Sequence, residues 1–329
     1  MVSKKKLSIL SSLIFAGTLL VACGDDTEKG ESTGGSSSSD GLETNIVTIA
    51  TGGASGPYNI IGTTLADIYT TEYDVNSRTQ TTGSSVENLN LMAQGKIEMG
   101  FVMSDALSQA VNGEVSFKEK IEGVSTIATL YPNVVQIIAK ANSGIQTIED
   151  LKGKRVAVGD QNSGVEVNAR TLLNGHGITY DDIKVDYLGY AEAADGLSAG
   201  TIDAAFLTSG LPNASVMELA KTTDIVLVTI SPEKVEEIAK EHSYFISYEI
   251  AANVYSNTEP VNTAAVPNAL VVKSDLSDDD VYKLTKTFFE SLPKLVNSHQ
   301  AAADISLEGA QEGIIGDLHP GAKRYYDEQ

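Results

Sequence analysis

The sequence predicts an α/β protein whose main body consists of two similar lobes. Short β-branched runs alternate with helical patterns along most of the chain, as is typical of α/β architecture with mainly parallel sheets. Segments 95–104 and 200–209 share glycine, isoleucine, an acid, phenylalanine and serine at the same spacing, which indicates a duplicated fold element. The body, from about residue 42 to 329, is longer than one core usually supports, so two lobes are expected.

The first 41 residues are predicted to export and anchor the body. Three lysines precede an apolar run that ends at Ala22, an order typical of a signal peptide over residues 1–22. The run Leu-Val-Ala before Cys23 resembles a bacterial lipobox, in which the cysteine sulfur receives a lipid after cleavage. Residues 23–41 are this cysteine and a flexible tether rich in Gly, Ser, Thr, Asp and Glu. We therefore expect an exported protein, lipid-anchored on the outer face of the cell membrane.

The charge of the chain argues against some partners. The formal net charge is −21, and loss of the signal peptide with its three lysines would make it −24. A chain this acidic is a poor match for nucleic acid. An anionic ligand would have to be held by local dipoles against the overall field of the protein.

Strands and helices are expected to alternate from the start of the body. The pattern predicts strands at 46–50, 79–81, 100–103 and 155–158, and helices at 58–69 and 86–94. A strand at 134–139 is expected to cross between the lobes, and the return crossing falls near 261–272, where Pro267 marks a bend. Lobe 1 is then formed by 42–136 and 262–329, and lobe 2 by 137–261. Residues 281–298 are expected to form one long amphipathic helix.

Polar loops, three of them containing glycine, follow the predicted strands at four places. The loops begin at Thr51, Thr82, Ser104 and Gly159, and each leads into a helix. Ligands of open α/β sheets bind at the carboxyl ends of strands, where helix N-termini offer free N–H groups and partial positive charge. These loops are the predicted ligand site.

For several polar residues in these loops, a purely structural role is the alternative to ligand binding. Ser85, Ser104 and Ser163 are good helix N-caps. Glu166 and Arg170 have the i,i+4 spacing of a surface ion pair. Asn88 and Asn168 are more informative, because asparagine is a mediocre residue inside a helix.

A set of ordered motifs covers nearly everything after the tether. They are Ala50–Gly53 with Gly56 and Tyr58, Thr81–Leu89, Leu130–Pro132, Leu151–Val156, Ser163–Gly164 with Glu166 and Asn168–Arg170, Tyr190–Asp195, and His319–Ala322 with Tyr325–Tyr326. In these motifs the chain resembles the TAXI family, the solute receptors of tripartite ATP-independent periplasmic (TRAP) transporters. Two departures are the polar loop 159–162 and Val165, where threonine is common.

The resemblance implies a type II periplasmic-binding-protein fold, with two α/β lobes joined by crossing hinge strands that close around one ligand. It implies a receptor that binds glutamate, a related amino acid or a dicarboxylate and delivers it to TRAP membrane subunits. Carried over, the ligand site comprises Gly53, Ser55, Tyr58, Asn88, Ser104 and Asp105 on lobe 1, and Ser163, Glu166, Asn168 and Thr208 on lobe 2. Tyr131 is a further candidate, with core packing as its alternative.

Other functions compete with this reading. A receptor for an ABC importer would need the same body and the same lipid. An enzyme on the same fold is the main rival class, but the four histidines are scattered and no catalytic cysteine or metal-ligand spacing is seen. A surface adhesin is weaker still, because no stalk module repeats. We expect a monomer that is not an enzyme and has no cofactor.

Overall fold

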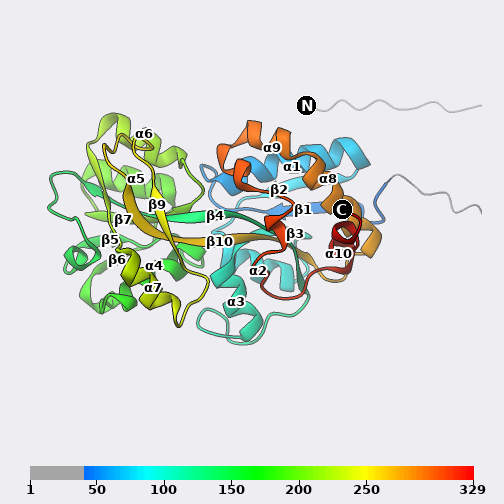
Figure 1. The fold of residues 1–329 in the computed structure, drawn as a ribbon, viewed down its shortest axis with the longest axis horizontal. Helices are drawn as coiled ribbons and strands as arrows, with labels where there is room; N and C mark the ends of the chain where they lie inside the picture. The colour runs from blue at the N-terminus through cyan, green and yellow to red at the C-terminus, as the bar shows by residue number, and fades with distance from the viewer. Residues whose placement is uncertain (1–40) are drawn as a thin grey trace, which may run out of the picture. The chain divides into compact units, whose positions relative to one another are not determined.

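The computed structural model describes residues 41–329, which form two α/β lobes joined by two long strands (Figure 1). Lobe 1 contains the first three strands together with the last three helices of the chain. Lobe 2 is formed by the middle of the chain, drawn in green and yellow. The predicted signal peptide, the lipidation site at Cys23 and the tether up to residue 40 lie outside the described residues.

The strands form one sheet that runs through both lobes, in the order β2-β1-β3-β10-β4-β7-β5-β6, with β8 on β4 and β9 on β10. Each lobe has three parallel strands in the same order, β2-β1-β3 in lobe 1 and β6-β5-β7 in lobe 2. The echoing segments 95–104 and 200–209 contain β3 and β7, which occupy equivalent positions. The bounds are β1 Ile46–Ala50, β2 Asn76–Gln80, β3 Met99–Met103, β4 Val124–Lys140, β5 Arg155–Ala157, β6 Lys184–Asp186, β7 Ala204–Ser209, β8 Ile225–Val228, β9 Ile246–Ile250 and β10 Val261–Lys273.

The long strands β4 and β10 cross between the lobes as an antiparallel pair. Pro132 of β4 lies opposite Pro267 of β10, and the register shifts between Pro267 and Ala269. Neither proline has an N–H to donate, so the ladder is weakened where the strands pass between the lobes. The predicted crossing strand at 134–139 is the second half of β4, and the predicted bend coincides with the register shift. The predicted lobe boundary at 136/137 lies inside this strand and stays a prediction.

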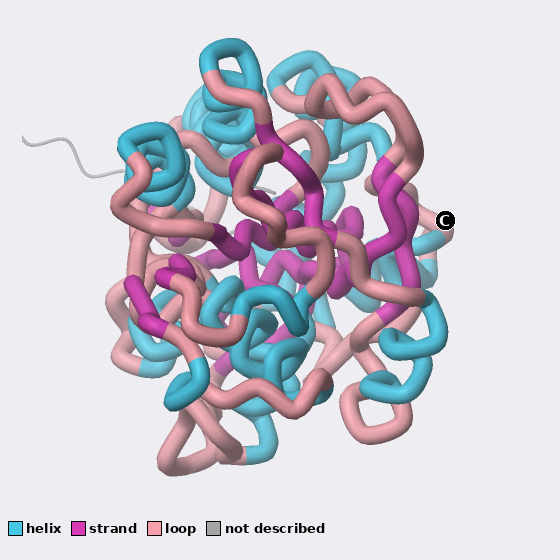
Figure 2. Tube along the Cα trace, turned by 90° about the vertical axis from the view of Figure 1, so that its left-hand side faces the viewer, coloured by secondary structure: helices cyan, strands magenta, loops and turns pink. Residues whose placement is uncertain are grey.

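Helices cover both faces of the sheet in each lobe, and Figure 2 shows the strands of lobe 2 between helices when that lobe faces the viewer. In lobe 1 the helices α1, α8, α9 and α10 share one core cluster, and α2 and α3 share another. In lobe 2 the pairs are α4 with α7 and α5 with α6. The bounds are α1 Pro57–Tyr73, α2 Ser85–Ala93, α3 Ser104–Asn112, α4 Gly164–Gly175, α5 Tyr190–Ala199, α6 Ala214–Thr222, α7 Pro232–Ala239, α8 Asp278–Glu290, α9 Leu292–Ser298 and α10 Pro320–Asp327.

The single helix predicted over 281–298 is wrong. The structure has two helices there, α8 ending at Glu290 and α9 beginning at Leu292. Pro293 lies at the start of α9, where its missing N–H costs nothing, but it could not continue α8. Among residues 41–329, no helix is long and apolar enough to span a bilayer.

Candidate functional site

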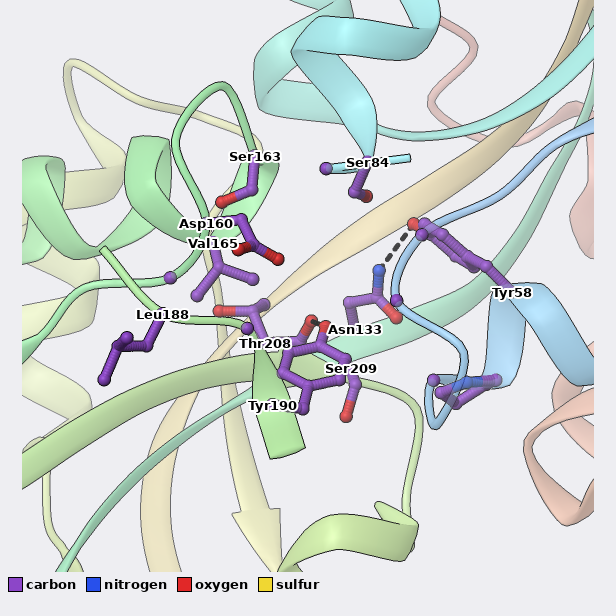
Figure 3. Close-up of a pocket in the computed structure, with 17 residues that line it drawn as sticks. Tyr58, Ser84, Asn133, Asp160, Ser163, Val165, Leu188, Tyr190, Thr208 and Ser209 are labelled. Atoms are coloured by element: carbon purple, nitrogen blue, oxygen red, sulfur yellow. Dashed lines mark hydrogen bonds between the residues drawn. The ribbon is translucent and has the colours of Figure 1, made fainter. Parts of the chain in front are cut away.

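A cavity lies where loops from the two lobes meet, and about 460 Å³ of space free of protein atoms lies there, part of it open to solvent (Figure 3). Lobe 1 contributes the loop after β1 with the start of α1, the residues just before α2 and one residue of β4. Lobe 2 contributes the loops after β5 and β6 and the end of β7. The lining residues are Gly52, Gly53, Gly56, Pro57, Tyr58, Gly83, Ser84, Asn133, Gly159, Asp160, Ser163, Val165, Leu188, Gly189, Tyr190, Thr208 and Ser209.

Four helices begin at this cavity. Their N-cap residues Gly56, Ser84, Ser163 and Gly189 start α1, α2, α4 and α5, and all four line it. Only Ser163 caps its own helix with its side chain, by accepting a hydrogen bond from the Glu166 N–H at 3.0 Å. First-turn N–H groups lack partners within their helix and carry partial positive charge. The four helix starts can therefore hold an anionic group without a basic side chain.

The backbone at Ser84 is unusual for a residue with a side chain. Ser84 has φ 89° and ψ −145°, a conformation that costs on the order of 1–3 kcal/mol outside glycine. Such strain is concentrated at functional sites, and here it lies in the cavity wall. The lobe 1 loop before α2 is thus held in a specific shape.

Two tyrosines line the cavity, Tyr58 from lobe 1 and Tyr190 from lobe 2. Tyr58 stacks on Phe101 with ring centroids 5.1 Å apart, and its hydroxyl accepts a hydrogen bond from Asn133 Nδ2 at 2.6 Å. The Tyr190 hydroxyl donates to the Thr208 carbonyl at 2.7 Å. Burial raises the pKa of Tyr58 and Tyr190, so both stay protonated. Asn133 Oδ1 and Thr208 Oγ1 are buried and have no hydrogen-bond partner within the described chain, so both can bond a ligand.

Asp160 is the one charged side chain among the residues that line the cavity in the described part of the chain. Burial, and then the nearby carboxylates Glu192 and Glu87, raise its pKa above the ordinary value. The described residues contain no cluster of three His, Cys, Asp or Glu side chains that could hold a metal ion. The cavity thus combines helix N-termini, neutral hydroxyl and amide groups, apolar walls and a single carboxylate.

The model of the NMT1-like family matches residues 49–329. The chain belongs to the NMT1-like family. Its fold is that of the periplasmic-binding proteins. A protein of Bordetella bronchiseptica RB50 is 18% identical, with a TM-score of 0.55 over 87% of this chain and 90% of that chain. A periplasmic transporter is 12% identical, with a TM-score of 0.53 over 86% and 94%. PhnD1 of Prochlorococcus marinus, solved with methylphosphonate, is 11% identical, with a TM-score of 0.52 over 78% and 91%.

Four of the predicted site residues line the cavity of this NMT1-like protein: Gly53, Tyr58, Ser163 and Thr208. Ser55 lies in the same loop as Gly53, but its hydroxyl accepts a hydrogen bond from Ser215 of lobe 2 at 3.0 Å. A contact with ligand stays a prediction for each of these residues. Ser55 already has a role in holding the lobes together.

Tyr131 is buried in the core of lobe 1 beside Tyr58, with ring centroids 6.4 Å apart. Its position fits the core-packing alternative. Its hydroxyl is nevertheless buried without a hydrogen-bond partner in the described structure. Tyr131 does not line the cavity itself.

The remaining predicted residues lie behind the cavity wall. Asn88 is fully buried and donates from Nδ2 to the carbonyls of Thr51 at 2.7 Å and Phe101 at 2.8 Å, which ties the ends of β1 and β3 together. Its unusual place inside a helix therefore has a structural reason. Glu166 pairs with Arg170, as its ion-pair alternative predicts, but it is buried rather than on the surface, and it also accepts a hydrogen bond from Tyr180 at 2.8 Å.

Asp105 and Asn168 meet each other across the junction of the lobes. Asn168 Nδ2 donates to Asp105 Oδ2, and both residues are fully buried. Ser104 is the first residue of α3 rather than its N-cap, which is Met103. Ser85 is likewise inside α2, and its hydroxyl accepts a hydrogen bond from the Met103 N–H at 3.0 Å. The N-cap expectation is therefore correct for Ser163 and wrong for Ser85 and Ser104.

Several lining residues were not among the predicted ones. Asp160 and Tyr190 fall inside motifs noted in the sequence, and their strand-end position was a usable signal. Asn133 follows a proline inside a crossing strand, where side chains are normally committed to the core. Leu188 and Gly189 carry no chemical signal of their own and are found only from the topology of β6 and α5.

Proposed function

We propose that this NMT1-like protein is an extracytoplasmic receptor that binds a small solute between its lobes and delivers it to a membrane importer. The observation that carries the proposal is the convergence of four helix N-termini, two from each lobe, on one cavity. A cavity lined by both lobes couples binding to closure, because the bound solute is held from two sides. A receptor, rather than an enzyme, also suits a lining with no histidine or cysteine among the described residues.

The lobes already touch beside the cavity, as expected for a closed receptor. The Glu87 N–H of lobe 1 donates to the Asn162 carbonyl of lobe 2 at 3.2 Å. An ideal Cβ on Gly164 would lie 2.7 Å from Ser85 Oγ, so glycine is needed for this approach. A Cβ on Gly56 would lie 3.1 Å from the Tyr190 ring. These contacts support a binding cycle in which the lobes separate to admit the solute.

The proposed solute is a small anion or zwitterion, such as a glutamate-like amino acid or a dicarboxylate. The helix N-termini can bind a carboxylate. The TAXI resemblance favours the same ligands and the TRAP membrane subunits as partner. The fold supports an ABC importer at least as well, because it carries no feature specific to the TRAP subtype. We also propose that the protein is lipid-anchored through Cys23 and acts as a monomer.

Native mass spectrometry of gently purified protein tests the proposed function directly. The expected result is a retained small molecule that is lost on unfolding and restored when the refolded protein meets the same compound. A thermal-shift screen of the refolded protein should then identify amino acids or dicarboxylates that raise the melting temperature. A ligand at about a thousand times its Kd stabilises the fold by roughly 4 kcal/mol. Stabilisation only by sugars or metal cations would overturn the proposed ligand class.

Crosslinking in the source membrane tests the partner. A photo-crosslinker on the rim of either lobe should capture large membrane subunits of the TRAP type if the resemblance holds. Capture of a permease that co-purifies with an ATPase would assign the protein to an ABC importer instead.

A further inference from the structure

The one charged side chain in the described lining of the cavity is acidic. The Asp160 carboxylate points into the cavity in Figure 3, and no hydrogen bond or ion pair joins it to any described residue. Glu87 of lobe 1 and Glu192 of lobe 2 lie close enough to raise its pKa further. A Cβ on Gly189 would meet Asp160 Oδ2 at 2.9 Å and Glu192 Oε2 at 2.8 Å, so these two carboxylates flank the same backbone position.

The two arginines on the neighbouring elements β5 and α4 are already paired with other acids. Arg155 of β5 binds Asp203 at 2.6 Å, and Arg170 of α4 binds Glu166 at 2.5 Å. The cavity lining contains no lysine or arginine in the described chain. The carboxylate of Asp160 is therefore half-buried beside like charges without a counter-charge, an unfavourable arrangement unless a cation fills the space.

A second, independent feature points to the same kind of group. Asn133 is 1% exposed and lines the cavity, and its Oδ1 has no partner in the described structure. Its Nδ2 donates a hydrogen bond to the Tyr58 hydroxyl, so the Asn133 oxygen is the atom of this side chain that lacks any partner. A carboxylate and an amide oxygen both require hydrogen-bond donors. A protonated amine offers three donors and the missing positive charge in one group.

We propose that Asp160 is the specificity-determining residue of the cavity and binds a protonated amine of the solute. This inference rests on the proposed function and narrows its ligand to zwitterions, with the carboxylate at the helix N-termini and the ammonium at Asp160. A dicarboxylate without an amine would add negative charge beside Asp160 and leave the Asn133 oxygen unbonded. Glu87 belongs to the opposite lobe from Asp160, so a bound ammonium also removes a repulsion across the lobe junction.

The amine is tested by pairs of probes that differ only in this group. Isothermal titration of refolded wild-type protein compares glutamate with glutarate, and leucine with 4-methylpentanoate. Losing a hydrogen-bonded ion pair in the cavity should weaken binding of the deaminated member by about tenfold or more. Asp160→Asn should remove most of this preference by weakening the amino acid alone. Asp195→Asn is the matched control, since Asp195 is exposed on α5 and outside the lining, and it should keep the preference.

Each outcome bears on a separate claim. Equal binding of an amino acid and its deaminated partner by the wild type would overturn the role of Asp160 and leave the receptor proposal standing. An unchanged preference in folded Asp160→Asn would do the same. Binding of neither member of either pair would overturn both this inference and the proposed solute class. If Asp160→Asn does not fold, the wild-type comparison alone decides the matter.

Discussion

The carboxyl of Asp105 in lobe 1 and the carboxamide of Asn168 in lobe 2 form a buried pair in which each partner has one unsatisfied oxygen. Asn168 Nδ2 donates to Asp105 Oδ2, while Asp105 Oδ1 and Asn168 Oδ1 have no partner among the described residues. A protonated Asp105 has a hydroxyl to donate, which can satisfy the Asn168 oxygen. Burial raises the pKa of Asp105 to about 7, which agrees with a neutral carboxylic acid in this place.

The first prediction is that Asp105 makes the free energy of unfolding depend on pH. Because its folded-state pKa of about 7 is above the ordinary 3.8, the stabilisation is complete below about pH 4 and is lost as pH rises to about 7. The slope approaches about 1.4 kcal/mol per pH unit in that window. Tyr58 and Tyr244 lie close enough to Asp105 for its charge to affect their pKa. Burial raises the pKa of both tyrosines, so both stay neutral in this pH range.

Urea unfolding of wild type and Asp105→Asn between pH 4 and 8 measures this contribution. Asparagine imitates the protonated acid, so the variant should lack this component of the slope. Asp67→Asn, at an exposed position of α1, is the matched control and should follow the wild type. Parallel curves for wild type and Asp105→Asn would refute the assignment.

The second prediction concerns Asn168→Ala. Removing the amide leaves the Asp105 carboxyl buried without its donor only when the lobes are closed, which should cost about 1–3 kcal/mol. Solute binding requires closure, so affinity for the best solute of the screen should fall by that amount in isothermal titration. Asn174→Ala, on the exposed side of the same helix, should bind normally. Equal affinity of both variants would show that the pair plays no part in closure.

The third prediction concerns the close approach at Gly164. A Cβ there would lie 2.7 Å from Ser85 Oγ and 2.9 Å from Met103 Sδ, both in lobe 1. Gly164→Ala should therefore hinder closure without unfolding either lobe. Small-angle scattering should show a smaller radius of gyration for the wild type with saturating solute, and little change for the variant. Gly41→Ala, where the nearest neighbour is 3.9 Å away, serves as control and should close like the wild type.

The fourth prediction concerns Cys23, which precedes the described residues. Cys23→Ser should remove the lipid and move the protein from the membrane fraction to the soluble extracytoplasmic fraction. Fractionation followed by immunoblotting checks this, with mass spectrometry of the wild type for the added lipid. Retention of the serine variant in the membrane would contradict the anchor.

Much of the fold could be predicted because local patterns and tertiary structure agree. β1 and β3 are short, mostly apolar runs with all or nearly all residues buried, and such runs are recognisable without knowledge of their neighbours. The first half of β4 was not predicted, because Pro132 argues against a strand when read alone. It is tolerated since Pro267 faces it on the neighbouring strand, a compensation that only the pairing shows.

The candidate site was only partly predictable, for a different reason. Strand ends located the loops, which is why Gly53, Tyr58, Ser163 and Thr208 fall in the lining. Which side of a first helical turn faces the ligand depends on how the lobes meet. Asn168 on α4 therefore turns toward Asp105, while Asp160, in the loop that leads into α4, faces the cavity.

The continuity of lobe 2 and the division of lobe 1 bear on how the nascent protein acquires its structure. Tyr326 in α10 donates its hydroxyl to the Ile127 carbonyl, 199 positions earlier, and it packs in the same cluster as α1 and β1. β10 lies between β3 and β4 in the finished sheet. As the chain emerges from its N-terminus, lobe 2 can therefore condense early, while the first half of lobe 1 remains with unpaired strand edges. At that stage the unpaired strand edges of lobe 1 are open to binding by a chaperone or to aggregation with other chains.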